Sequence, residues 1–112
     1  MPPHQTTITA LGHTLLLTGT VAERRFVTFA GAQAGADAKV LGISALAGIA
    51  GDAIAVTLVG TVDMVAGADI AAGDAVISNA DGLPVPKGAG TNVAAVALNT
   101  ALSGQRVTLL IR

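Results

Sequence analysis

The chain has 112 residues, a length that suits one domain with a single core. Its net charge is −1 and it has no cluster of Lys and Arg of the kind that nucleic acid or an anionic membrane surface requires. Hydrophobic residues make up 52% of the chain and charged residues only 12%, and Cys, Trp and Tyr are absent, which excludes thiolate chemistry and most aromatic-lined binding grooves. A monomer would expose apolar patches of the kind that contact other proteins.

The N-terminal residues Met1 to Gln5 are polar and rich in proline. They contain neither a basic segment nor a long apolar segment, so they do not form a signal peptide. No later stretch approaches the ~18 apolar residues of a membrane span. We therefore expect an extended N-terminal arm over residues 1–5 and one domain over residues 6–112.

Alternation of apolar and polar residues predicts strands along most of that domain. In Thr14 to Val21, the residues Leu15, Leu17 and Val21 share one face. Further runs predict strands beginning at Phe26, over Ile54 to Val65, around Val76 to Ser78, over Val93 to Leu98 and over Val107 to Ile111. The chain's 14 glycines interrupt nearly every window long enough for a helix, although one helical turn near Gln33 to Ala38 is left open.

Turn residues separate the predicted strands. Gly51-Asp52, Gly73-Asp74 and Gly104-Gln105 each stand just before a strand, and Asn79 to Gly82 is typical of a tight turn. Pro84 and Pro86 restrict the segment around Val85 to a sheet edge or a loop. Six to nine short strands of this kind predict an all-β sandwich or small barrel.

Chemistry-bearing motifs are scarce. The two histidines, His4 and His13, precede Ser44, Ser78 and Ser103, but no serine lies in a nucleophile-elbow motif. The Gly-rich segments Gly31 to Gly35 and Gly88 to Thr91 lack the pattern of a phosphate loop. We expect no catalytic residue and no cofactor.

The aspartates favour turn capping over metal binding. Asp69 and Asp74 bracket four residues without the ligand density of a calcium loop, and most of the others stand beside Gly or Ala. We expect no metal site.

Glu23-Arg24-Arg25 is the dense charge cluster of the sequence. It suits either a solvated loop or a contact with another subunit, because arginine pairs well with carboxylates at protein interfaces. Phe26 and Phe29 are both predicted to lie in the core.

From about Phe26 to Arg112 the chain resembles the capsid cement (decoration) family of tailed bacteriophages. The resemblance is carried by short turn-and-strand pieces in a fixed order, which here read Val40-Leu41-Gly42-Ile43-Ser44, Gly51-Asp52-Ala53-Ile54-Ala55-Val56, Gly60-Thr61-Val62-Asp63-Met64, Ile70-Ala71-Ala72-Gly73-Asp74-Ala75-Val76, Asp81-Gly82 and Arg106-Val107-Thr108-Leu109-Leu110-Ile111. The segment from Met1 to Arg25 departs from that pattern.

The resemblance implies a small β-barrel of the tulip-like type that forms homo-oligomers, commonly trimers. Such proteins sit on the outer surface of the expanded virion head, where they bridge neighbouring major capsid proteins and need no catalytic group. We interpret Glu23, Arg24 and Arg25 as oligomer or capsid contacts. The arm is expected to add a strand to a capsid sheet through Gln5, Thr6, Thr7, Ile8 and Thr9.

Other functions remain open at this point. A head-fibre, tail or baseplate module would have the same composition. A ligand-binding barrel for a small molecule or sugar would need a pocket with convergent polar groups. A small phage enzyme would need His13 and Asp74 for activity.

Overall fold

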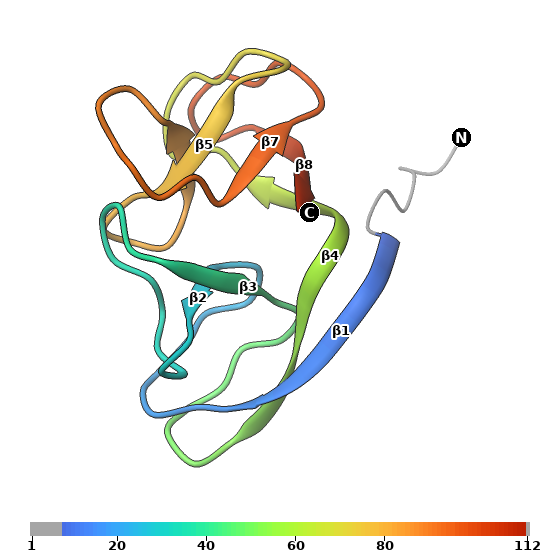
Figure 1. Ribbon diagram of the computed structural model, residues 1–112, viewed down its shortest axis with the longest axis vertical. Helices are drawn as coiled ribbons and strands as arrows, with labels where there is room; N and C mark the ends of the chain where they lie inside the picture. The colour runs from blue at the N-terminus through green and yellow to red at the C-terminus, as the bar shows by residue number, and fades with distance from the viewer. Residues whose placement is uncertain (1–7, 112) are drawn as a thin grey trace.

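The computed structural model describes residues 8–111, with side chains from Leu11 onward. Eight strands make up the regular structure of these residues (Figure 1): β1 Ile8–Leu16, β2 Phe26–Thr28, β3 Val40–Ser44, β4 Ala53–Val65, β5 Ala75–Ser78, β6 Pro84–Pro86, β7 Ala95–Ala97 and β8 Arg106–Ile111. The described part of the chain contains no helix that could cross a membrane. Residues 33–38 contain a turn at residues 36 and 37 but not the helical turn that the sequence left open, because Asp37 has a φ of 51°, outside the right-handed helical region.

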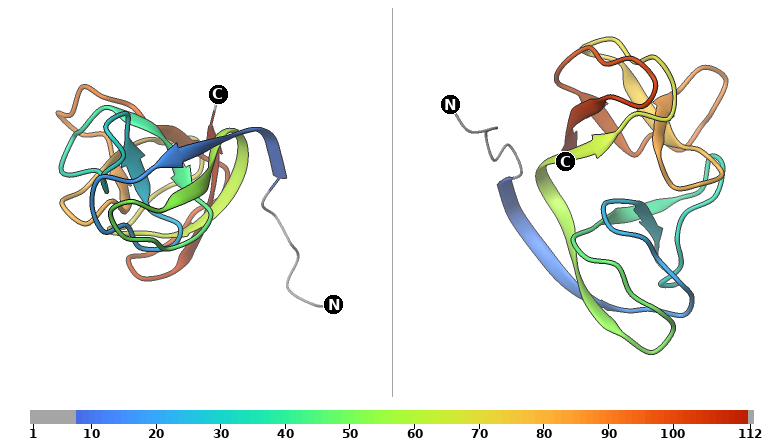
Figure 2. Two further views of the ribbon diagram at one scale, coloured as in Figure 1. Left: turned by 90° about the horizontal axis from the view of Figure 1, so that it is seen from below. Right: turned by 180° about the vertical axis from the view of Figure 1, so that it is seen from behind.

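All eight strands belong to one antiparallel sheet, in the order β2-β3-β4-β8-β7-β5-β6, with β1 attached to β4. The two ends of this order come together, since the backbone N–H of Phe26 in β2 donates to the carbonyl of Gly82, just before β6, at 2.9 Å. The sheet is therefore a nearly closed antiparallel barrel (Figures 1 and 2), which confirms the predicted all-β fold.

The long strand β4 organises the whole sheet. Thr57 pairs with Gly12 of β1 and with Ile43 of β3, and Gly60 likewise pairs with both β1 and β8. It follows that β1 runs along one edge of β4, while β3 and then β8 occupy the other. Gly60 has a φ of 135°, and the β1 pairing shifts register opposite it, so the strand bends there. Among the described residues, the outer edge of β1 pairs with no strand.

Three strands are preceded by turns of the same construction. In the first, the Asp52 carboxylate accepts the backbone N–H of Ile49 at 3.0 Å, and the glycine between them, Gly51, has a φ of 94°. Asp74 accepts from Ala71 in the same way. The side-chain carbonyl of Gln105 makes the equivalent contact with Leu102, at 3.1 Å. The similarity of the Gly51-Asp52 and Gly73-Asp74 segments is thus a repeated turn-to-strand unit.

The β5–β6 hairpin confirms two further predictions. Gly82 has a φ of 75°, and the Asn79 side-chain oxygen accepts the backbone N–H groups of Asp81 and Leu83. Both prolines lie in β6, which is the last strand in the sheet order. Proline is tolerated there because the N–H that it lacks is not needed to pair with a further strand.

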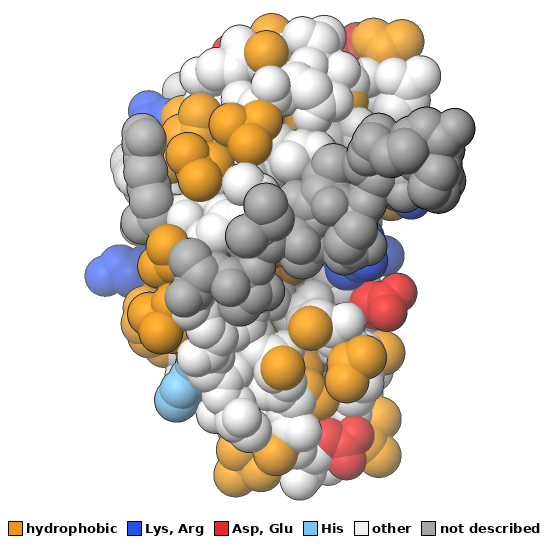
Figure 3. All heavy atoms as spheres, turned by 90° about the vertical axis from the view of Figure 1, so that its right-hand side faces the viewer, with side chains coloured by type: hydrophobic (Ala, Val, Ile, Leu, Met, Phe, Trp, Pro, Cys, Tyr) orange, Lys and Arg blue, Asp and Glu red, His pale blue; other side chains and the backbone are white. Residues whose placement is uncertain are grey.

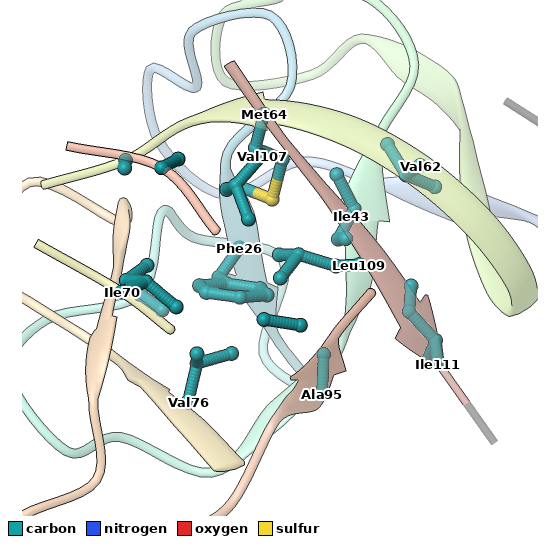
Figure 4. Close-up of a cluster of buried hydrophobic side chains, with 14 residues drawn as sticks. Phe26, Ile43, Val62, Met64, Ile70, Val76, Ala95, Val107, Leu109 and Ile111 are labelled. Atoms are coloured by element: carbon teal, nitrogen blue, oxygen red, sulfur yellow. The ribbon is translucent and has the colours of Figure 1, made fainter. Parts of the chain in front are cut away.

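The buried side chains form two clusters. Figure 4 shows Phe26 at the centre of the larger cluster, surrounded by residues that include Ile70, Val76 and Leu109. The smaller cluster comprises Leu15, Leu17, Val21, Val27, Ile54 and Val56. Adjacent residues of β2 therefore serve different clusters, and β4 contributes to both through its two halves.

Two sequence predictions about the apolar residues have different outcomes. Leu15, Leu17 and Val21, which the sequence placed on one face, are all buried. Phe26 is fully buried, but the prediction for Phe29 is wrong, since it is 68% exposed. Phe29 lies one residue beyond the end of β2, in a turn where strand alternation no longer governs direction.

Candidate functional site

Apolar side chains cover much of the surface. Among the residues with described side chains, nine large hydrophobic residues are between 48% and 68% exposed: Leu11, Leu16, Phe29, Leu46, Ile49, Val65, Val93, Leu98 and Leu102. Figure 3 shows such side chains in several groups on the face that carries β1. Large apolar side chains that gather on the surface are typical of a protein that assembles with others.

The predicted charge cluster lies in a loop that is fixed by the buried hydroxyl of Ser44. The Ser44 Oγ donates to the carbonyl of Ala22 at 2.8 Å and accepts the backbone N–H of Arg25 at 3.1 Å. The backbone N–H of Arg24 donates to the Ser44 carbonyl at 3.0 Å. Water could not easily replace these three bonds, because Ser44 is 1% exposed. The backbone of the loop is therefore held in place.

The three charged residues of this loop line a hollow of about 470 Å³. Arg24 has a φ of 54°, a conformation that residues with a side chain rarely adopt. The Arg25 guanidinium donates to the Asp81 carbonyl at 2.9 Å, which fixes it against the β5–β6 turn. For the side chain of Arg24, no interaction is seen among residues 8–111.

Most of the remaining lining of the hollow comes from β4 and β8. Asp63 lies there, with its carboxylate 6% exposed, and accepts the hydroxyl of Thr108 at 2.7 Å. The guanidinium of Arg106 lies 4.0 Å from the same carboxylate and is 63% exposed, so most of its surface faces solvent. The register of β4 against β8, which pairs Asp63 with Thr108, brings this part of the lining together.

Sequence reasoning found one part of the lining of the hollow and missed the rest. It singled out Glu23, Arg24 and Arg25, which the structure does bring together. It did not single out Asp63 or Arg106, because each is an isolated charge within an otherwise ordinary strand pattern. The available signal was the polar residue Arg106 directly before the apolar alternation that starts at Val107, and only the strand register could bring it to the hollow that Arg24 lines.

The residues proposed for the arm are described only in part. Gln5, Thr6 and Thr7 lie outside the described residues. Ile8 and Thr9 are the first residues of β1 and pair with Thr61 and Gly60 of β4. They thus begin the strand whose outer edge is unpaired among residues 8–111.

The side chains considered for catalysis have structural roles. Ser44 and Ser78 are buried, and their hydroxyls donate to backbone carbonyls. Asp69 accepts the backbone N–H of Ser103 at 2.9 Å, and Asp74 caps its own turn. Within residues 8–111, no three His, Asp or Glu side chains gather in a way that could hold a metal ion.

Asp37 has a different structural role, in that it holds a distant loop. Its carboxylate accepts the backbone N–H groups of Asn92 at 2.9 Å and Thr91 at 3.1 Å. These two bonds, Asn92 first and Thr91 second, hold the pKa of the Asp37 carboxyl below its ordinary value of 3.8. The Gly-rich segment Gly88 to Thr91 is therefore a loop that Asp37 holds against the barrel by hydrogen bonds at its C-terminal end.

Comparisons with known proteins agree with this architecture. No curated protein sequence matches the chain. Among solved structures, the chain is similar to the N base of the head fibre protein gp8.5 of bacteriophage phi29, with a TM-score of 0.70 and 23% identity over 91% of this chain and 93% of that one. At this identity the likeness shows a shared fold. The model of the phage cement protein family matches residues 4–112, which is nearly the whole chain. The chain therefore belongs to the phage cement protein family, a family of non-enzymatic structural proteins of the phage head.

Proposed function

We propose that this protein sits on the outer surface of the expanded phage head, where it binds the major capsid protein and bridges neighbouring copies of it. It acts as a homo-oligomer, with three copies as the expected number. The observation that carries the proposal is the set of nine exposed apolar side chains on a chain of the cement family. A freely soluble monomer gains nothing from such a surface, whereas contacts between subunits and with a shell would bury it.

A binding protein of this kind stabilises a shell without chemistry. If it binds the expanded lattice and not the precursor, it shifts the equilibrium toward the expanded form by mass action. Repetition of the same contact over a symmetric shell, and within an oligomer, raises the effective affinity above that of one contact.

The N-terminal segment supplies a second contact in this proposal. Residues Gln5 to Thr9 lead into β1, whose outer edge is unpaired among the described residues. A strand edge of this kind offers backbone N–H and carbonyl groups to a strand of another protein. We therefore assign Gln5, Thr6, Thr7, Ile8 and Thr9 to a contact with a sheet of the capsid protein.

Co-sedimentation with expanded and precursor heads tests the main proposal. The purified protein is first sized by light scattering and then mixed with empty heads of each form. We expect an oligomer that pellets with expanded heads, leaves precursor heads bare, and raises the temperature at which expanded heads disrupt. A monomer that ignores both forms would contradict the proposal.

Hydrogen exchange on free and head-bound protein tests the strand contact separately. We expect amides in Gln5 to Thr9 to gain protection on binding. Those of Ile8 and Thr9 that already bond to β4 should change little, because alternate amides of a strand point to opposite edges. Binding without any gain in this segment would remove the strand contact and leave the head-binding proposal intact.

The likeness to the phi29 head-fibre base favours one second candidate function. A fibre base attaches a projecting structure to the head, whereas cement strengthens the shell. The two are separated by the stability of expanded heads: a base that binds without raising their disruption temperature is an attachment module.

A further inference from the structure

We propose that the hollow between the loop of residues 22–25 and strands β4 and β8 receives an acidic side chain of the neighbouring shell protein, with Arg24 and Arg106 as the residues that bind its carboxylate. The inference rests on the proposed head-binding function and names one point of contact within it. The chain has six Lys and Arg residues in all, and three of them, Arg24, Arg25 and Arg106, line this single hollow.

The arginines of the hollow differ in how they are already engaged. Arg25 bonds the Asp81 carbonyl, so its guanidinium is partly committed to holding the turn. Arg106 approaches Asp63 only at 4.0 Å and is mostly exposed. Arg24 is half-buried and makes no side-chain interaction within the described residues. Two guanidinium groups with spare donors, from the loop and from β8, therefore line one hollow, and planar guanidinium groups bind carboxylates in bidentate fashion.

The backbone of Arg24 supplies an independent observation. Its left-handed conformation is disfavoured for a residue with a side chain, and strained backbone of this kind persists where the surroundings impose it. Here Ser44 imposes it, through its backbone and its hydroxyl, from beneath the loop. The backbone of Arg24 is therefore held before any partner arrives, which reduces the backbone entropy lost on binding.

The charge balance of the hollow identifies the kind of partner. Three arginines stand against the carboxylates of Glu23 and Asp63, so the hollow carries a net charge of only about +1. A polyanion such as nucleic acid calls for a much larger positive surface. A single carboxylate matches the excess, and the apolar residues Val65 and Leu83 in the lining provide contact for its methylene groups.

The carboxylates of this chain itself are poorly placed to fill the hollow in a second copy. Each of the turn aspartates already accepts a backbone N–H group: Asp37, Asp52, Asp69 and Asp74. Glu23 and Asp63 line the hollow, and the backbone carbonyl of Asp81 accepts a hydrogen bond from Arg25, which also lines it, so Asp81 lies next to the hollow. A second copy could offer these three groups only by facing the same hollow. The shell protein is therefore the partner to which we assign the acidic side chain.

Binding of charge variants to expanded heads tests the inference. Arg24→Glu reverses the charge at a half-buried loop position without touching the Ser44 bonds, which involve only backbone atoms of the loop. We expect about a 10- to 100-fold weaker binding for this variant, and an intermediate loss for Arg24→Lys, which keeps the charge and loses the bidentate geometry. Lys39→Glu makes the same charge change at another exposed site and serves as the matched control, with binding expected within about twofold of wild type.

Salt and oligomer size complete the experiment. Wild-type binding should weaken as salt rises, and Arg24→Glu should weaken less, because the screened contact is already lost. Equal binding of wild type and Arg24→Glu to expanded heads would overturn the inference while the head-binding function stands. An Arg24→Glu protein that binds as wild type but no longer forms the wild-type oligomer would assign the hollow to a second copy instead. Failure of the wild type itself to bind would defeat the proposed function.

Discussion

A methyl group added at Gly42 tests the closest approach of two strands in the barrel. Gly42 lies in β3, and a Cβ atom built there would lie 2.3 Å from the carbonyl oxygen of Thr57 and 2.7 Å from a methyl group of Val56, both in β4. Real Cβ contacts do not fall below 3.0 Å, so Gly42→Ala forces the two backbones apart by roughly 0.7 Å. The obstacle is backbone, which cannot rotate away as a flexible side chain can.

The size of the effect follows from what this separation disrupts. The β3–β4 ladder is short, with Ile43 opposite Thr57 and Ser44 opposite Val56. Weakening about two backbone hydrogen bonds costs roughly 1 kcal/mol each. Displacing the buried Val56 adds about 1–2 kcal/mol of strain in the smaller core cluster. We expect Gly42→Ala to lower the free energy of unfolding by about 2–4 kcal/mol.

Urea unfolding of this variant, wild type and Gly35→Ala measures the effect. Gly35 is exposed, has an ordinary φ, and has nothing within 4 Å of an added Cβ, so Gly35→Ala should leave stability unchanged or raise it by about 0.4–1 kcal/mol. With a slope of about 2 kcal/mol/M, the midpoint for Gly42→Ala should fall by about 1–2 M. If the two alanine variants unfold within about 0.5 kcal/mol of each other, the two strands do not approach as closely as described.

Two further outcomes are expected. Ser44→Ala should lower the free energy of unfolding by about 1–3 kcal/mol, because partly buried backbone groups of Ala22 and Arg25 lose their hydrogen-bond partner, and head binding should weaken as well. A decrease of less than about 0.5 kcal/mol in urea unfolding would argue against the structural role of the Ser44 hydroxyl. The pKa of the Asp37 carboxyl is lowered in the folded state, so the ionised carboxylate stabilises the fold. This contribution to folding stability is complete above the ordinary pKa of 3.8 and is lost as the pH falls below that value toward the folded pKa. Hydrogen exchange at the amide of Thr91 should therefore lose protection in acid in the wild type, whereas Asp37→Asn should show no such dependence on pH.

Local features of the fold were predictable because their causes are local. The Gly-Asp and Gly-Gln turns need only a residue that accepts positive φ and a nearby side-chain acceptor, and all three form as predicted. Proline lacks a donor wherever it stands, so the edge position of β6 also follows from the sequence.

Long-range pairing was not predictable in the same way. The strand predicted over Thr14 to Val21 begins at Ile8 and ends at Leu16, because its limits are set by the opposite strand β4. Ladder bonds extend β1 through residues such as Gly12 that carry no apolar alternation of their own. The candidate site shares this limitation, since Arg106 reaches the hollow of Arg24 only through the β4–β8 register.

The bent strand β4 has a mechanical consequence for a protein that strengthens a shell. Its first half supplies Ile54 and Val56 to one buried cluster, and its second half supplies Val62 and Met64 to the other. Because β4 is continuous, unfolding one half of the barrel would also pull on the part of β4 whose side chains pack in the other cluster. The two halves are therefore expected to unfold together. Force applied at one end of the molecule is thus resisted as shear along the ladders on both edges of β4, and the barrel is expected to yield as one unit.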